Sequence, residues 1–402
     1  MRAWFFSEMA YPDVWKPEFP TLRNSLPSSY FDPEIGKKLL NRHLDEWMLA
    51  DELGMDVMTN EHHSTATCLA VSPSVITGIL ARQTKRARIL ALGHAISNRP
   101  DPVRVAEETA LVDVISGGRL EVGLIRGTPT ELTATNSNPA RMHERFWEAH
   151  DLILKAWTTH DGPFSWQGEH FQHRNVNIWP RPYQQPHPPV WISGSSSQAG
   201  RMIAERGHVY AIFFGGFRGR EWLDAYRKRY SEVWNAAASP DRLACMIMAA
   251  VGSTDEEGRR RADVMRGYLR TAPQVLVQYS NPPGYLTPEV NAHILRQASS
   301  GAKISIFQIE LSNGKRVDLA NASVDELIDA GVMFAGSPDT VFKQLCRYHD
   351  DLGGIGHLVV MGQAGELSAE DTVDSMSLFA REVLPRFSEY ARESQAQMPV
   401  YE

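Results

Sequence analysis

The sequence of 402 residues lacks the features that mark several large classes of protein. It has only three cysteines and no CxxC pair, so we expect neither a disulfide framework nor a zinc–thiolate site. The formal net charge is -7 and no run of Lys and Arg occurs, which argues against nucleic acid or an anionic membrane surface as the main partner. No apolar run approaches the roughly 20 residues of a membrane span, and the N-terminus leaves no room for a signal peptide. We therefore expect a cytoplasmic protein.

Two common catalytic motifs are also missing. The nucleophile elbow Gly-x-Ser-x-Gly does not occur, and the nearest string, at 194–198, ends in glutamine. The glycine-rich stretch at 215–219 matches neither a P-loop nor the GxGxxG dinucleotide fingerprint. Covalent hydrolysis and ATP chemistry are therefore disfavoured.

Short apolar runs do alternate with segments of helical spacing along the chain, which is typical of βα units around a parallel sheet. Eight such runs fit an α/β protein with a (β/α)₈ TIM barrel, whereas a doubly wound sheet more often uses about five to seven strands. We expect a single barrel domain over 1–402. The runs are 2–6, 55–59, 87–93, 120–125, 189–193, 208–214, 243–251 and 357–362.

Two regions interrupt the alternation. Residues 161–187 predict a small hairpin and an extended crossing before the fifth strand. Residues 271–333 predict an insertion after the seventh strand, long enough to act as a lid or as a wall of the substrate pocket. Several aromatic residues are candidates to line an apolar pocket at the mouth or simply to pack: Trp4, Phe6, Tyr11, Trp15, Tyr30 and Phe213.

The triplet Glu61, His62 and His63 directly follows the second predicted strand, where the active site of a barrel lies. Two imidazoles beside a carboxylate supply an acid/base pair near neutral pH. Because side chains alternate on an extended segment, one histidine can face the mouth while the other packs. A metal site is the competing interpretation, but the sequence offers no convincing further ligands. We therefore predict no metal.

Two later strands end in groups suited to an anion. Arg126 follows the fourth strand and stands beside glycine, so it can bind a phosphate or form a structural salt bridge. The stretch 193–197 follows the fifth strand and precedes a helical pattern. It can cradle a phosphate at a helix N-terminus or serve as an ordinary N-cap.

With these residues in place, the chain resembles the luciferase-like, flavin-dependent monooxygenase family, related to bacterial luciferase and the alkane monooxygenases. The resemblance covers the first strand to about residue 250. Its most specific part holds the elements PxRxAEE, SGGR and GxxRG in order. The blocks that carry it are 60–63, 101–127 and 188–195.

The resemblance implies that reduced FMN binds at the barrel mouth and reacts with dioxygen, through a flavin (hydro)peroxide, to oxygenate a small organic substrate. It also implies that a separate NAD(P)H-dependent flavin reductase supplies the reduced flavin, and that the protein is a homodimer. His62 corresponds to the catalytic acid/base of the family, with Glu61 and His63 in support. A deazaflavin-dependent oxidoreductase and a non-catalytic flavin-binding relative remain alternatives, and the retained triplet and Arg126 argue against the second.

The resemblance also assigns residues to the cofactor. The flavin phosphate ligands correspond to Arg126, Ser195 and Ser196, within the loop that also holds Ser193 and Gly194. The end of the third strand, with Gly93, His94 and Asn98, is expected to lie against the flavin and to hold a non-prolyl cis peptide near 93–95. Departures from the luciferase pattern at Ile125 and His94 leave the substrate open, as well as the choice among hydroxylation, Baeyer–Villiger insertion and C–heteroatom cleavage.

Overall fold

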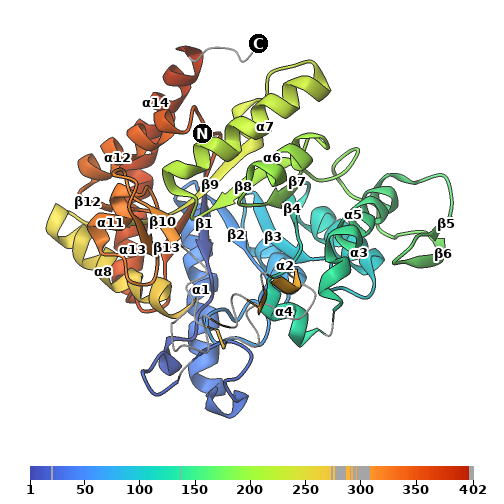
Figure 1. The fold of residues 1–402 in the computed structure, drawn as a ribbon, viewed down its shortest axis with the longest axis horizontal. Helices are drawn as coiled ribbons and strands as arrows, with labels where there is room; N and C mark the ends of the chain where they lie inside the picture. Colours follow the sequence, from blue (N-terminus) through green and yellow to red (C-terminus); the bar gives the residue numbers. More distant parts are fainter. Residues whose placement is uncertain are drawn as a thin grey trace.

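A computed structural model gives the fold of the chain (Figure 1). The residues that it describes are 1–19, 21–135, 137–272, 275–276, 287–289, 291–292, 296 and 308–397.

Eight parallel strands form a closed barrel in the centre of the molecule (Figure 1). The ring closes because the last strand pairs with both the first strand and the seventh. The prediction of an α/β fold with a (β/α)₈ TIM barrel is therefore confirmed, and each of the eight predicted runs forms a barrel strand. In ring order the strands are β1 Arg2–Ser7, β2 Asp56–Thr59, β3 Ile89–Ala95, β4 Leu120–Ile125, β7 Val190–Ser193, β8 Val209–Phe213, β9 Leu243–Val251 and β13 His357–Gln363.

The barrel strands are apolar almost throughout because both of their faces are buried. In β3, Leu90 and Leu92 belong to the cluster inside the barrel, whereas Ile89 packs in the cluster under the helices. In β1, Phe6 lies inside and Phe5 lies outside in the same way. Alternation along each strand thus builds two cores, one within the ring and one around it.

Helices surround the barrel, and several begin where the sequence places a capping residue before a proline. The side chain of Asp32 accepts hydrogen bonds at the start of α1, and Asp101 does the same for α3. The helices of the described chain are α1 Pro33–Glu52, α2 Pro73–Gln83, α3 Pro102–Ser116, α4 Pro129–Ala134, α5 Met142–Thr158, α6 Ser197–Ala204, α7 Gly219–Trp234, α8 Asp255–Thr271, α11 Val324–Asp329, α12 Pro338–Asp351, α13 Ala369–Leu378 and α14 Leu384–Gln397.

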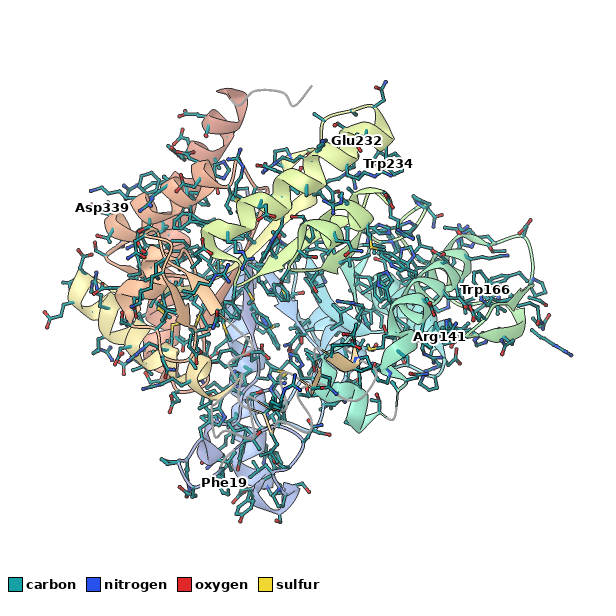
Figure 2. All side chains as sticks on the ribbon, in the orientation of Figure 1. Phe19, Arg141, Trp166, Glu232, Trp234 and Asp339 are labelled. Atoms are coloured by element: carbon teal, nitrogen blue, oxygen red, sulfur yellow. The ribbon has the colours of Figure 1, made fainter. Side chains whose placement is uncertain are left out.

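Both regions that interrupt the alternation contain structure of their own. Between α5 and β7, the strands β5 Phe164–Gln167 and β6 Gln172–Val176 pair as an antiparallel hairpin. Figure 2 shows Trp166 of this hairpin near one edge of the molecule, away from the barrel. Residues 273–274, 277–286, 290, 293–295 and 297–307 of the expected lid at 271–333 lie outside the described residues. Its described part holds the pair β10 Gln308–Glu310 and β11 Arg316–Asp318, and β12 Met333–Gly336 then pairs with the end of β9.

Trp4 does not lie at the mouth, where the sequence had made it a candidate for the substrate pocket. Its backbone pairs with Asp56, the first residue of β2, and its indole Nε1 donates a hydrogen bond to Nδ1 of His357, the first residue of β13, at 3.1 Å. Trp4 therefore belongs to the floor of the barrel, the end at which the strands begin. The sequence pattern predicted the strand, but it did not predict how far Trp4 lies along the barrel axis from the mouth.

Candidate functional site

Polar residues gather at the mouth of the barrel because all eight strands run parallel and end at the same rim. Glu8 follows β1, and Glu61, His62 and His63 follow β2. Arg126 directly follows β4. The triplet and the arginine thus lie at the end of the fold where barrel enzymes place their active sites.

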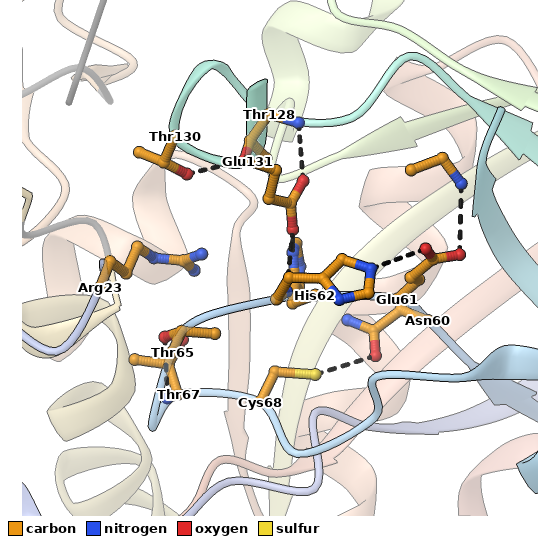
Figure 3. A network of polar contacts seen from close by, with 12 residues as sticks. Arg23, Asn60, Glu61, His62, Thr65, Thr67, Cys68, Thr128, Thr130 and Glu131 are labelled. Atoms are coloured by element: carbon orange, nitrogen blue, oxygen red, sulfur yellow. Dashed lines mark hydrogen bonds and ion pairs between the residues drawn. The ribbon is translucent and has the colours of Figure 1, made fainter. Parts of the chain in front are cut away.

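His62 forms a close pair with Glu131, a residue of α4 just beyond β4 (Figure 3). The imidazole Nδ1 lies 2.8 Å from Oε1 of Glu131. The other oxygen of Glu131 accepts a hydrogen bond from the backbone N–H of Thr128 at 2.8 Å, which fixes the carboxylate. On the far side of the ring, Nε2 of His62 lies 3.9 Å from Oε2 of Glu8, beyond hydrogen-bond distance.

Electrostatics favour the charged form of this pair. Burial disfavours an imidazolium at His62, but the charge and hydrogen bond of Glu131, together with Glu8, outweigh burial and raise its pKa. Burial likewise opposes the carboxylate of Glu131, yet His62 and Thr128 lower its pKa to about 2. Near neutral pH, His62 can hold a proton on Nε2 while Nδ1–H donates to Glu131. The pair is thus suited to hold and release a proton at Nε2.

Glu8 is held in place by neutral groups from two other elements. It accepts a hydrogen bond from Nδ2 of Asn60 at 2.8 Å and one from the Tyr268 hydroxyl, in α8, at 2.7 Å. The Cys68 thiol in turn donates to Oδ1 of Asn60 at 3.4 Å. Burial, reinforced by the charge of Glu8, raises the pKa of both Tyr268 and Cys68. These groups stay protonated and orient Glu8 toward His62.

The side chains of the triplet form two pairs rather than one cluster, although the backbone N–H of His63 also donates to Oε1 of Glu131 at 3.3 Å. Oε1 of Glu61 lies 2.8 Å from Nε2 of His63, and its Oε2 accepts a hydrogen bond from Arg99 at 2.9 Å. Burial opposes the carboxylate of Glu61, but His63 and Arg99 lower its pKa overall. Glu61 also accepts from the backbone N–H of Ala95 at 3.3 Å, so it supports the end of β3. His62 pairs instead with the carboxylate of Glu131.

The end of β3 holds the non-prolyl cis peptide that the resemblance led us to expect. The peptide bond between Leu92 and Gly93 is cis, next to the predicted position at 93–95. A Cβ at Gly93 would lie 2.6 Å from the carbonyl oxygen of Gly123, so only glycine fits there. His94 is buried, and burial lowers its pKa to about 4, which keeps the ring neutral.

Buried polar atoms at the ends of β2 and β3 lack partners within the described part of the chain. They are both ring nitrogens of His94, both side-chain polar atoms of Asn98, and the hydroxyls of Thr59 and Ser97. Buried donors and acceptors are rarely left without hydrogen bonds in folded proteins. A polar ring system bound at this end of β3 would supply them, so these residues fit a flavin.

Arg126 and the serine loop are neighbours, because β4 pairs with β7. Arg126 is exposed and, among the described residues, makes no ion pair, so the structural salt bridge left open by the sequence is not formed. Ser196 is an N-cap: its hydroxyl accepts from the N–H of Ala199 at 3.1 Å. A Cβ at Gly194 would lie 2.6 Å from that of Ala199, which explains the glycine. Ser193 and the exposed Ser195 stand beside this helix N-terminus, and the set fits a phosphate.

Other site classes receive no support from the residues that are described. In that part of the chain, no group of three or more His, Cys, Asp or Glu side chains is placed to hold a metal ion. Within the same limits, none of the helices combines the length and apolar character needed to cross a membrane.

Sequence reasoning missed Glu131 and Tyr268. Glu131 lies five residues beyond Arg126, in a short helix after β4, and its position past a strand end was a usable signal. Tyr268 lies in the last turn of α8, and no local pattern distinguishes it from a packing residue. Glu8 directly follows β1, but no sequence pattern indicates that it approaches His62, because this depends on how the loops after β1 and β2 fold.

The chain matches the luciferase-like monooxygenase family over residues 29–353. Among curated relatives, it is 28% identical over 180 residues to the oxygenase component of the flavin-dependent trigonelline monooxygenase of Acinetobacter baylyi. That alignment covers 44% of this chain and 49% of the relative, so the match spans about half the length of that protein.

Two solved structures share the fold at low sequence identity. The oxygenating constituent of 3,6-diketocamphane monooxygenase from Pseudomonas putida, a type II Baeyer–Villiger monooxygenase in complex with FMN, has a TM-score of 0.67 at 18% identity and covers 96% of this chain and 98% of its own. An F420-dependent secondary alcohol dehydrogenase has a TM-score of 0.62 at 16% identity, with 86% and 94% covered. Since the family match covers most of the chain, the chain belongs to the luciferase-like monooxygenase family and is an enzyme of the flavin-dependent oxidoreductase class.

Proposed function

We propose that the protein is a monooxygenase that uses reduced FMN and dioxygen to oxygenate a small organic substrate. The observation that carries the proposal is the His62–Glu131 pair, set at a mouth where buried polar atoms at the end of β3 have no partner among the described residues. When bound, reduced FMN supplies the electrons that activate dioxygen. The relative from Acinetobacter baylyi is named as flavin-dependent, which supports a flavin, and the FMN in the Pseudomonas putida structure supports the choice of FMN.

Each part of the site has a role in this proposal. Arg126, with Ser193, Gly194, Ser195 and the N-terminus of α6 capped by Ser196, binds the phosphate. The end of β3, with Gly93, His94 and Asn98, lies against the flavin ring, and its buried polar atoms bind the ring edge.

His62 holds and moves a proton at Nε2, and Glu131 orients it by accepting from Nδ1–H. Glu61 and His63 fix the β2 and β3 loops relative to each other. The barrel mouth excludes water from this proton.

Reduced flavin would come from a separate NAD(P)H-dependent reductase. The relative from Acinetobacter baylyi is named as an oxygenase component, which supports a two-component system. We place the enzyme in the cytoplasm, since all three cysteines are free and two of them are buried.

A homodimer is the proposed assembly, formed through the neighbouring helices α2 and α3. Val75 is 60% exposed on α2, and Leu111 and Ile115 are 48% and 47% exposed one turn apart on α3. An apolar face of this kind is typical of an interface. Light scattering should report a dimer that Ile115→Lys converts to monomer, while Val233→Lys on the exposed face of α7 leaves the mass unchanged.

The test of the proposed function is rapid mixing of the purified protein with photoreduced FMN and then with oxygenated buffer. We expect a transient near-ultraviolet absorbance that is absent with FMN alone. Absence of this transient, with tight binding of a deazaflavin and hydride exchange on it, would overturn the proposal. That result would favour the second candidate, a deazaflavin-dependent oxidoreductase, for which the likeness to the F420-dependent dehydrogenase is the supporting observation.

A further inference from the structure

Hydrogen bonds from Asn24 hold the segment around Arg23 against two loops at the mouth of the barrel. The N–H of Asn24 donates to the carbonyl of Ser64 at 2.7 Å, in the loop after β2. The side-chain amide of Asn24 donates to the carbonyl of Thr130, in α4 beyond β4, also at 2.7 Å. Arg23 itself forms a β-bridge with Thr65. Its position therefore depends on the same two loops that hold His62 and Glu131.

The guanidinium of Arg23 faces these residues. Its Nε donates to the carbonyl of Ala272 at the end of α8 at 2.7 Å, which fixes the direction of the side chain. Figure 3 shows the guanidinium entering between Thr130 and Thr65 and directed at His62. Electrostatic interactions with His62, Cys68 and Tyr268 agree with this placement.

The charge of Arg23 is not paired with any carboxylate that the structure describes. Within the described residues the guanidinium makes no ion pair, and its two terminal nitrogens make no hydrogen bond. Glu131 already accepts from His62 and Thr128, and Glu8 from Asn60 and Tyr268. A half-buried guanidinium normally pairs with an anion, and its two terminal nitrogens match the two oxygens of a carboxylate.

We propose that Arg23 binds the carboxylate of the substrate, so that the enzyme acts on small organic acids presented as anions beside His62. The inference rests on the proposed function, because it takes the mouth to be the substrate site. It adds a specificity residue that the family motifs do not include, since Arg23 precedes all of them in the sequence. Recognition of the anion orients the substrate, and His62 remains free to handle the proton.

The experiment compares matched carboxylate and amide ligands by calorimetry, with and without saturating FMN. Benzoate is paired with benzamide and hexanoate with hexanamide, so that each pair differs only in charge and in the second oxygen. We expect each carboxylate to bind at least about tenfold more tightly than its amide. Arg23→Gln should bring this ratio to about one. A merely structural role of Arg23 would instead weaken both ligands of a pair equally.

Two further variants keep the test sharp. Arg23→Lys keeps the charge but loses the planar fork, so it should retain only part of the preference and provides a reading if Arg23→Gln folds poorly. Lys16→Gln removes a neighbouring exposed positive charge and should leave the ratio unchanged.

Equal binding of carboxylates and amides by the unmodified protein, including no binding of either, overturns the proposal, as does an unchanged ratio in Arg23→Gln. A loss of FMN affinity alone in that variant assigns Arg23 to the flavin and overturns it too. Carboxylate preference does not depend on oxygen chemistry. A protein that keeps the preference but gives no near-ultraviolet transient would therefore sink the proposed monooxygenase and leave the anion site standing.

Discussion

The two ends of the barrel use the same residue types to opposite electrostatic effect. At the floor, His357 accepts from the Trp4 indole at Nδ1 and donates from Nε2 to the carbonyl of Asp241 at 2.9 Å. Both nitrogens are satisfied by neutral groups, and burial lowers the pKa of His357 to about 4. At the mouth, His62 has a carboxylate on Nδ1, its Nε2 makes no hydrogen bond to any residue that the structure describes, and its pKa is raised.

The carboxylates show the same contrast. At the floor, Glu121 accepts from the Trp191 indole and from Arg88, yet burial dominates and raises its pKa. At the mouth, Glu131 has a pKa of about 2. At the floor, the hydrogen bonds of His357 and Glu121 hold their protons in place. At the mouth, the charged pair of His62 and Glu131 leaves Nε2 of His62 available to a ligand. An enzyme needs the second arrangement where chemistry occurs and the first where the fold must hold.

The largest effect is expected from His62→Ala. Loss of the group that holds the proton should lower the rate of substrate oxygenation by about 10²- to 10⁴-fold. FMN affinity should stay within about twofold, because the phosphate and ring contacts that we propose lie at the ends of β3, β4 and β7. Turnover with photoreduced FMN and fluorescence titration of FMN measure the two quantities. If His62→Ala lowers turnover and FMN affinity equally, the division of roles between His62 and Arg126 is contradicted.

Glu131→Gln should have the next largest effect, a loss of about tenfold to hundredfold in turnover. Removing the carboxylate takes away what raises the pKa of His62, so this pKa falls and the alkaline limb of the rate profile moves to lower pH. The measurement is the rate between pH 5 and pH 10. Glu61→Gln is the matched control, since Glu61 pairs with His63, and it should leave that limb in place. Equal displacement by both variants would contradict the pairing.

Glu121→Gln tests the floor. It leaves the buried Trp191 indole with an acceptor but removes the charge that pairs with Arg88, and we expect a loss of about 1–3 kcal/mol in the free energy of unfolding. Urea unfolding measures this loss. The pH profile of turnover should not move, because the floor lies at the opposite end of the strands. A shifted profile would show that the two ends are coupled.

The smallest effect is expected from His357→Gln, whose amide can accept from Trp4 and donate to Asp241 as the imidazole does. Because His357 has a pKa of about 4 in the fold against an ordinary 6.5, the unfolded chain takes up this proton first as pH falls between these values. This group therefore costs stability progressively below pH 6.5. The variant should lose less stability than the parent between pH 7 and pH 4.5, as measured by urea midpoints. If the variant and the parent lose the same stability between pH 7 and pH 4.5, His357 is not the titrating group.

The mouth pair contributes to stability with the opposite sign. The raised pKa of His62 gives stability that is present below 6.5 and is lost as pH rises through the folded value. The lowered pKa of Glu131 gives stability that is present above 4.5 and is lost as pH falls toward about 2. Both statements describe the same ion pair, whose contribution to stability is fully present between about pH 4.5 and pH 6.5.

Local sequence patterns were enough to predict the barrel, because each strand is a buried apolar run and each break is marked by glycine, proline or a capping residue. They also placed His62 and Arg126 at strand ends, where a parallel barrel brings them to one rim. They could not reveal that Glu131 rather than Glu61 pairs with His62, since this depends on how the β4 loop folds back over β2. The level of Trp4 along the barrel axis was hidden for the same reason, because it depends on strand register.

The most direct test of the contrast between mouth and floor is a pH titration of the histidine ring nitrogens by ¹⁵N NMR, with His62→Gln and His357→Gln used to assign the signals. We predict that His62 titrates above 6.5 and His357 near 4. If the pKa of His62 lies below 6.5, the account of a charged proton-handling pair at the mouth is contradicted.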